Sequence, residues 1–382
     1  MASLTDRPRK RLTSTTRREA GAAHHRPQAR PPRPSRRQKR RLSREQRRQA
    51  ARKAGLSRRQ LKLIGGQLPA PVHAVFEPLA QALTRPTYRR LVLLALAAIL
   101  TVGGRTLAKL LRTLGALAPG HPSSYHRVLS HRRWSTRRLA RRYIAAVLNR
   151  FAPHGTVEVV GDDTVTEHPG AKVYGKGCHR DPVRSTHAFT AYRWGHKWVV
   201  LAMLVRFPFC RRRWSLPLLV ALYRPEEEGV DGVTKRAHKT PVDLLGQMLR
   251  ILIRWFPDRR FVCCADGNYA AHELAEVAAA APQHLTLVSK FYPHANLFEP
   301  PPPAPGKRPA HRPPKKGKEL PDPAQVVRDT PNRPLLSVAW YGGQRRRVEV
   351  VTGSGWWYRS GRPLIPVRWV FVHDRTGTHR DE

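Results

Sequence analysis

Acidic residues are scarce in this sequence. Its 382 residues include 26 Asp and Glu against 71 Lys and Arg, which gives a formal net charge of +45 at pH 7. Like charges repel one another in a compact chain, so folding alone does not require such an excess. A polyanionic partner does, because each Lys or Arg placed against a phosphate releases a condensed counterion and gains affinity. We therefore expect the partner to be a nucleic acid.

Cysteine is also scarce. The four cysteines, Cys178, Cys210, Cys263 and Cys264, form no CxxC pair, so the pattern predicts neither a zinc site nor a disulfide framework. Cys178 stands beside His179 and could begin a metal site, but no second ligand pair follows downstream.

Long apolar runs are missing as well. The longest, LVLLALAAILTV from Leu91 to Val102, is about half of the roughly 20 residues that a membrane-spanning helix needs. It is typical of a buried helix. The N-terminus carries charge but no apolar segment with a small-residue cleavage site, so we expect no secretory signal and no membrane association. The expected location is the reducing bacterial cytoplasm, with the protein at the nucleoid.

The composition divides what remains into five segments. Residues 1–65 form a basic arm that we expect to be largely disordered, with one marginal helix at 43–63. Residues 76–152 have helical periodicity and predict a DNA-binding region. Its last helix carries four candidate DNA-binding arginines, although simple solvation explains their pattern equally well. These are Arg137, Arg138, Arg141 and Arg142.

Residues 156–290 predict a mixed α/β domain. We expect three antiparallel strands, then helix, strand, helix and strand, which is the order of an RNase H-like sheet flanked by helices. The expected elements are strands 156–164, 185–194 and 196–207, a helix at 240–256 capped by Thr240, a strand ending at Asp266, a helix at 269–281 and a strand at 285–290. Trp194 and Trp198 should pack on one strand face, with His196 as a hydrogen-bonded histidine between them. Residues 291–333 are interpreted as a Pro and Lys-rich loop, and residues 334–382 as a β-rich insertion or return.

Carboxylates at strand ends are conspicuous where acids are few. VEVVGDD places Asp162 and Asp163 just past one predicted strand, and FVCCADG places Asp266 at the end of another. The carboxyl ends of strands are where α/β sheets carry their sites, and carboxylates gathered there repel unless a cation lies between them. A pair of Mg²⁺ ions about 3.5 to 4 Å apart is the usual arrangement for cutting phosphodiesters. Turn and cap roles are the alternative for each residue taken singly.

Several motifs in this order resemble the DDE-type transposases of bacterial insertion sequences, the DDE superfamily endonucleases. They are VVGDDT at 159–164, GKGCHRDPVRS at 175–185, RWGHKWVVLAMLV at 193–205, CCADGNYA at 263–270 and PVRWVFVHDRTG at 366–377. The resemblance implies metal ligands at Asp162, with Asp163 as the adjacent possibility, and at Asp266. It also implies two Mg²⁺ ions, for which Mn²⁺ can substitute.

The third acid of the family, a glutamate on a later helix, has no counterpart here. The sequence ends at Glu382, which no helix would hold in place. Glu273 and Glu276 follow Asp266 on a helix, where we expect them to face solvent or to support the site from outside. The expectation is therefore a C-terminally truncated transposase that binds DNA and whose cleavage activity is in question.

The resemblance also implies partners. They are the terminal inverted repeats and the target, both double-stranded DNA, with a homodimer assembled on them. Trp357, in the β-rich segment, is a candidate for stacking on an unpaired base, with Arg359 beside it as a second candidate DNA-binding residue. A role in the core is the default interpretation of the tryptophan. The alternative function is a non-catalytic derivative that occupies the terminal repeats or inhibits full-length transposase.

Overall fold

A computed structural model describes residues 70–170, 173–181, 183–225, 237–302, 314–340, 344–377 and 381. They belong to the second of the two units into which the chain divides, Leu68–Glu382. The predicted basic arm at 1–65 and its helix at 43–63 lie outside the described residues.

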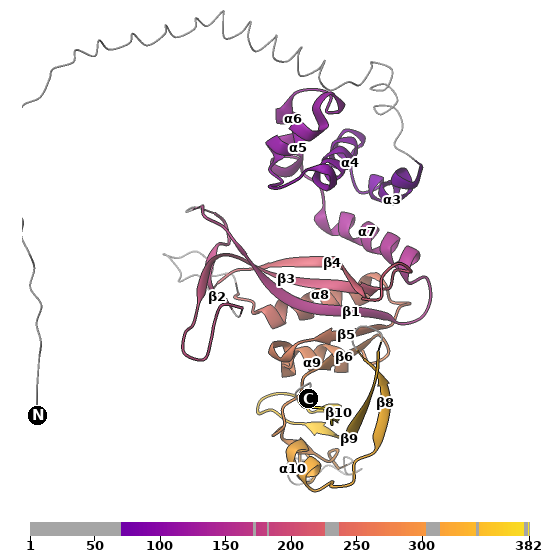
Figure 1. Ribbon diagram of the computed structural model, residues 1–382, viewed down its shortest axis with the longest axis vertical. Helices are drawn as coiled ribbons and strands as arrows, with labels where there is room; N and C mark the ends of the chain where they lie inside the picture. Colours follow the sequence, from indigo (N-terminus) through magenta and orange to yellow (C-terminus); the bar gives the residue numbers. More distant parts are fainter. Residues whose placement is uncertain are drawn as a thin grey trace, which may run out of the picture. The chain divides into compact units, whose positions relative to one another are not determined.

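The first part of this unit is helical (Figure 1). Its helices are α3 (Ala70–Ala80), α4 (Arg85–Leu100), α5 (Leu107–Leu114), the 3₁₀ turn η1 (Gly115–Leu117), α6 (Pro122–Ser130) and α7 (Thr136–Phe151). Leu110 and Leu114 of α5 pack with Leu94 of α4 in one small core. The apolar run in α4 is not buried throughout, because Ile99 and Leu100 are 73% and 68% exposed.

A six-stranded mixed sheet follows, and β1 lies inside it. Its strands are β1 (Val157–Glu167), β2 (Gly177–Arg180), β3 (Tyr192–Val205), β4 (Trp214–Tyr223), β5 (Phe261–Ala265) and β6 (Leu285–Ser289). Strand β3 pairs antiparallel with one edge of β1, and β2 and β4 both pair with the other edge of β3. Strand β5 pairs parallel with the opposite edge of β1, and β6 pairs with β5. The expected α/β class, a mixed sheet flanked by helices, is confirmed.

The prediction of a separate strand at 185–194 was wrong. Residues 183–191 form turns and loop, and β3 runs unbroken from Tyr192 through Gly195 to Val205. Gly195 suggested a link between two strands, but it serves a close approach instead. A Cβ at this position would lie 2.1 Å from the backbone oxygen of Thr166 in β1, so only glycine lets the two strands approach this closely.

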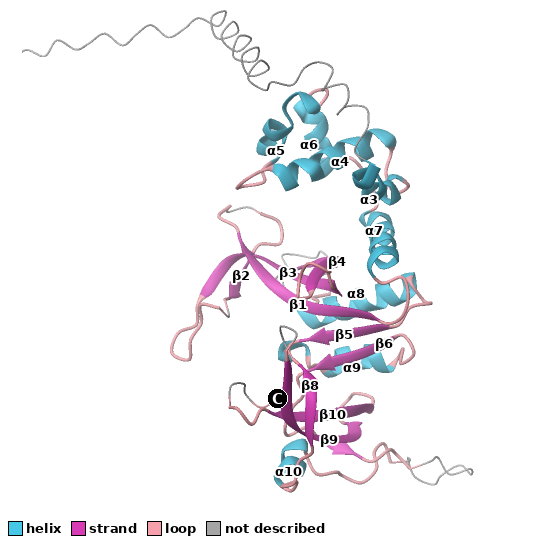
Figure 2. Ribbon diagram, turned by 45° about the vertical axis from the view of Figure 1, so that its right-hand side comes forward, coloured by secondary structure: helices cyan, strands magenta, loops and turns pink. Residues whose placement is uncertain are grey.

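Helices pack on one face of the sheet (Figure 2). Helix α8 (Pro241–Trp255) starts at the expected cap, since Thr240 and Asp243 form a capping box. Helix α9 (His272–Ala279) follows β5 after the 3₁₀ turn η2 (Gly267–Tyr269), so it begins later than predicted. Side chains of α7, α8 and α9 form one core with the sheet. On the opposite face, Val220 and Val288 are 53% and 50% exposed.

A second, antiparallel sheet completes the described chain. It consists of β7 (Leu297–Phe298), β8 (Leu335–Ala339), β9 (Arg345–Trp357) and β10 (Ile365–His373), accompanied by α10 (Pro323–Arg328). Its core includes Leu297, Trp357 and Trp369 and is packed against Ala275 of α9. The segment 291–333 is therefore not a loop throughout, because β7 and α10 lie within it and Leu297 is buried.

Candidate active site

The two neighbouring aspartates lie inside β1 and not beyond its end. Pairing with β3 continues to Glu167 opposite Gly195, so the strand is longer than predicted. Pairing with parallel β5 stops earlier, at Gly161 opposite Ala265. Asp162 and Asp266 directly follow this last pair, which places them side by side where the two chain segments part. Side chains that the sequence separates by about a hundred positions thus meet at one point of the sheet.

Asp162 and Asp163 point to opposite faces of the sheet, because side chains alternate along a strand. Gly161 faces α8, since a Cβ there would lie 2.5 Å from Cδ2 of Leu245. Asp163 therefore lies on the α8 face with Gly161, whereas Asp162 is exposed on the opposite, more open face. The Oδ1 atom of Asp162 accepts a hydrogen bond of 2.7 Å from the backbone N–H of Asp163.

Asp163 is held by two side chains that the sequence analysis did not identify. The Nζ atom of Lys197 lies 3.1 Å from its Oδ2, and the hydroxyl of Tyr269 donates to the same oxygen at 3.2 Å. Lys197 lies on β3, and its register partner Val165 is two residues from Asp163 on the same face. Tyr269 is 1% exposed in η2. The β1–β3 register brings Lys197 to this carboxylate. Lys197 lies in the motif at 193–205, but that motif gives it no role.

Asp266 caps the 3₁₀ turn that follows β5. Its side chain accepts from the backbone N–H of Asn268 at 3.1 Å and from Nδ2 of Asn268 at 3.0 Å. Its carbonyl oxygen accepts from the Oγ of Ser289 on β6 at 2.8 Å. These bonds confirm the Asp-Gly turn as a structural role and also fix the carboxylate beside Asp162.

The electrostatics of this cluster work against the ionised form of Asp162. Desolvation raises the pKa of Asp162 above its usual value, and the charges of Asp266 and Asp163 raise it further. The backbone N–H of Asp163 and the ammonium of Lys197 lower it. Burial, followed by the charge of Asp163, likewise raises the pKa of Tyr269, which therefore stays protonated and remains a donor. A cation beside Asp162 and Asp266 would relieve their repulsion.

A family model described as DDE superfamily endonuclease matches residues 78–347, well over half of the chain. The chain belongs to the DDE superfamily endonucleases. The resemblance stated from the motifs is thereby confirmed, and the mixed sheet flanked by helices fits a nuclease-like DDE fold. A comparison with curated proteins gave no match.

DDE superfamily endonucleases act on DNA and generally use divalent metal ions. The carboxylates of Asp162 and Asp266 suit such ions, since Mg²⁺ prefers oxygen ligands and the two acids repel each other. Within the described residues, no group of three or more His, Cys, Asp and Glu side chains is placed to hold a metal, and Cys178 with His179 forms none. Also within that part of the chain, no helix is long and apolar enough to cross a membrane.

The candidate DNA-binding arginines of this DDE endonuclease lie on the first two turns of α7. Ser135 caps the helix by accepting from the backbone N–H of Arg138. All four arginine side chains are exposed, as DNA contact requires and as simple solvation also allows; they are Arg137, Arg138, Arg141 and Arg142.

The residues proposed in the β-rich segment are engaged within the protein. Trp357 is 9% exposed and packs on His272, with ring centroids 4.9 Å apart, so a base could stack on it only if the ring left this core. Arg359 makes ion pairs with Glu273, and Arg362 binds both Glu273 and Glu276. The two glutamates therefore connect α9 to the β9–β10 turn.

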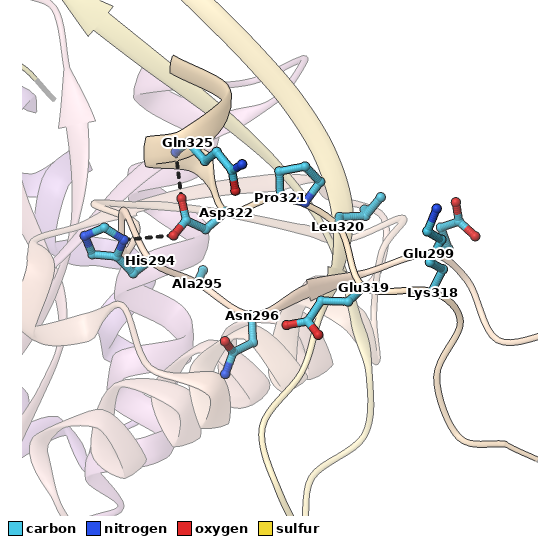
Figure 3. Close-up of a pocket in the computed structure, with 10 residues that line it drawn as sticks. All are labelled: His294, Ala295, Asn296, Glu299, Lys318, Glu319, Leu320, Pro321, Asp322 and Gln325. Atoms are coloured by element: carbon cyan, nitrogen blue, oxygen red, sulfur yellow. Dashed lines mark hydrogen bonds and ion pairs between the residues drawn. The ribbon is translucent and has the colours of Figure 1, made fainter. Parts of the chain in front are cut away.

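A pocket of about 640 Å³ lies elsewhere, beside β7 and the start of α10 (Figure 3). Asp322 caps α10 through the backbone N–H of Gln325 at 2.7 Å and binds Nδ1 of His294 at 2.9 Å. The hydrogen bond with His294 lowers the pKa of Asp322. These contacts fix the capping loop, and Asp162, Asp163 and Asp266 are not among the residues that line the pocket.

Proposed function

We propose that the protein is a DNA transposase that cuts DNA at the ends of an insertion sequence and joins the freed ends to a target. The observation that carries this proposal is the meeting of Asp162 and Asp266 where β1 and β5 part, in a chain of the DDE superfamily endonucleases. The net charge of +45 supports a partner with a phosphate backbone.

The residues of this site have different proposed roles. Asp162 and Asp266 would hold Mg²⁺, which when bound would polarise the phosphate and activate the attacking water or 3′-hydroxyl. Asp163 fixes β1 through Lys197 and Tyr269, so it is a positioning residue in this account. The ammonium of Lys197 offsets part of the negative charge and keeps Asp162 more easily ionised. The open face of the sheet on which Asp162 lies is the side from which DNA approaches.

A gel shift against the terminal inverted repeats, paired with an assay for Mg²⁺-dependent end cleavage, tests the proposal. Specific binding with cleavage supports a transposase, which we expect to act as a homodimer on DNA. Specific binding without cleavage supports the alternative, a derivative that occupies the repeats or inhibits full-length transposase. Binding with no preference for the repeats contradicts both.

A further inference from the structure

An exposed aromatic surface lies on the same strand face as Asp162. Asp162 pairs with Val200 of β3, and every second residue back along β3 shares that face: Trp198, His196 and Trp194. Trp194 was expected to pack, but its exposed fraction is 60%. Trp198 is half-buried between Trp194 and the aspartate. Exposed tryptophan on an extended strand has a solvation cost that a ligand would remove.

A second exposed ring is fixed beside it. Tyr174 is 71% exposed and precedes β2, and its carbonyl oxygen lies 3.0 Å from Nε2 of His196. The ring of His196 also lies 5.8 Å from that of Trp198. The predicted role of His196 as a hydrogen-bonded histidine is confirmed, and its bond ties the Tyr174 loop to β3. The two rings are therefore parts of one built surface.

A cationic side chain lies close to the ring of Trp194, and another lies close to the ring of Tyr174. The Nζ of Lys176 lies 5.7 Å from the ring centroid of Trp194, and the guanidinium carbon of Arg224 lies 5.4 Å from that of Tyr174. Arg224 also donates to the hydroxyl of Tyr174. Rings that stack on bases, combined with cations that bind phosphates, are the usual composition of surfaces for unpaired nucleic acid. Apolar protein partners would gain nothing from the two cations.

We propose that this surface, Tyr174, Lys176, Trp194 and Arg224, binds unpaired nucleotides of the DNA that the Asp162 site cleaves. The inference rests on the proposed function and adds a binding site to it. Trp194 is six residues from Val200 along β3, or roughly 20 Å at the rise of a strand. In one strand of duplex DNA, at 3.4 Å for each nucleotide, that span corresponds to about six nucleotides. Trp194 is therefore within reach of bases that become unpaired a few nucleotides from the cleaved bond.

Binding of the full chain to two DNA probes tests this surface. One probe is a blunt duplex, and the other carries a single-stranded extension containing 2-aminopurine, whose fluorescence is quenched on stacking. We expect Trp194→Ala to weaken binding to the extended duplex by about fivefold or more and to abolish the quenching, with blunt-duplex binding unchanged. Trp194→Phe should retain most of the quenching, because the phenyl ring still stacks.

Trp214→Ala is the matched control, since Trp214 is 51% exposed and lies opposite Val205, at the other end of β3. It should leave both probes unaffected. Tyr174→Leu provides a second variant at a side chain too exposed to be needed for folding. Equal weakening on both probes, or no change on either, would overturn the proposal while leaving the transposase assignment intact. Failure of the wild-type chain to bind either probe would instead overturn the assignment itself.

Discussion

In the proposed site, the charge of Asp162 determines the pH at which Mg²⁺ would bind. Desolvation and the charges of Asp266 and Asp163 raise the pKa of Asp162, so this group stays protonated to a higher pH than a free aspartate. Cleavage should therefore fall as the pH falls through that raised value. More Mg²⁺ should move the acidic limb of the pH–rate profile to lower pH, because metal and proton compete for the same carboxylate. An acidic limb whose position does not change with the Mg²⁺ concentration would contradict competition between metal and proton at Asp162.

The burial of Asp162 and its repulsion by Asp266 and Asp163 also lower the stability of the folded protein at neutral pH. An acid with a raised pKa binds its proton more tightly in the folded state, so its contribution to stability is lost as pH rises through that pKa. In metal-free protein at neutral pH, Asp162→Asn should therefore raise Tm. Mg²⁺ should raise the Tm of the wild type more than that of the variant. A lower Tm for Asp162→Asn without metal would show that the carboxylate is stabilising, contrary to its surroundings.

Lys197 influences the proposed metal ligand Asp162 without being a proposed ligand itself. Replacing it with methionine removes the ammonium 3.1 Å from Asp163 and a charge that lowers the pKa of Asp162. We expect Lys197→Met to reduce cleavage about 10- to 100-fold, as removal of outer-sphere partners commonly does, and to move the acidic limb to higher pH. Lys197→Arg keeps the positive charge, so its pH–rate profile should have its acidic limb at the same pH as the wild type. A slower enzyme with an unchanged pH profile would indicate a purely structural lysine.

At the scale of elements, the close approach of β1 and β3 depends on one glycine. Gly195→Ala would place a Cβ 2.1 Å from the backbone oxygen of Thr166, and the backbone cannot move aside cheaply. The free energy of unfolding in urea should fall by about 1–3 kcal/mol, as overpacking typically costs. Gly104→Ala is the control, since its nearest neighbour is the flexible end of Lys109 at 3.4 Å. Equal effects of the two substitutions would refute the close-approach explanation.

The same glycine shows how far the sequence could predict the elements. Helices α7 and α8 were predictable because Ser135 and Thr240 mark their starts and apolar residues recur along them. Strand β3 was divided wrongly, since a glycine inside a strand and a glycine between strands look alike in sequence. Pairing explains the difference, because Gly195 faces neighbours on both sides, Glu167 in β1 and Gly177 in β2.

The site was predictable to a similar degree. Asp162 and Asp266 stand in the motifs that carry the family resemblance, and the parallel register of β1 and β5 brings them together. Lys197 and Trp194 lie in the motif at 193–205, which assigns neither of them a role. Their place depends on which residues oppose one another across β1 and β3, and a shift of register by one residue would reverse their faces. Pairwise strand alignment is the information that the sequence did not provide.

At the scale of the whole molecule, the excess of positive charge predicts binding that depends steeply on salt. Removing one arginine that neutralises a phosphate should reduce the slope of log K against log salt by about 0.9. If α7 lies against DNA, Arg137→Ala combined with Arg141→Ala should lower that slope by nearly twice this amount. Arg250→Ala combined with Arg254→Ala, at exposed positions of α8, provides the comparison. Equal slopes for the two double variants would show that the arginines of α7 are only solvated.

Cleavage by the Asp266→Asn variant tests the central claim most directly. Asparagine keeps the shape of the side chain and can still accept from Asn268, so β5 and η2 should fold as before. The variant should bind terminal-repeat DNA with the affinity of the wild type and show no Mg²⁺-dependent cleavage where the wild type cleaves. Cleavage that survives Asp266→Asn would contradict the assignment of Asp162 and Asp266 as the metal-binding pair.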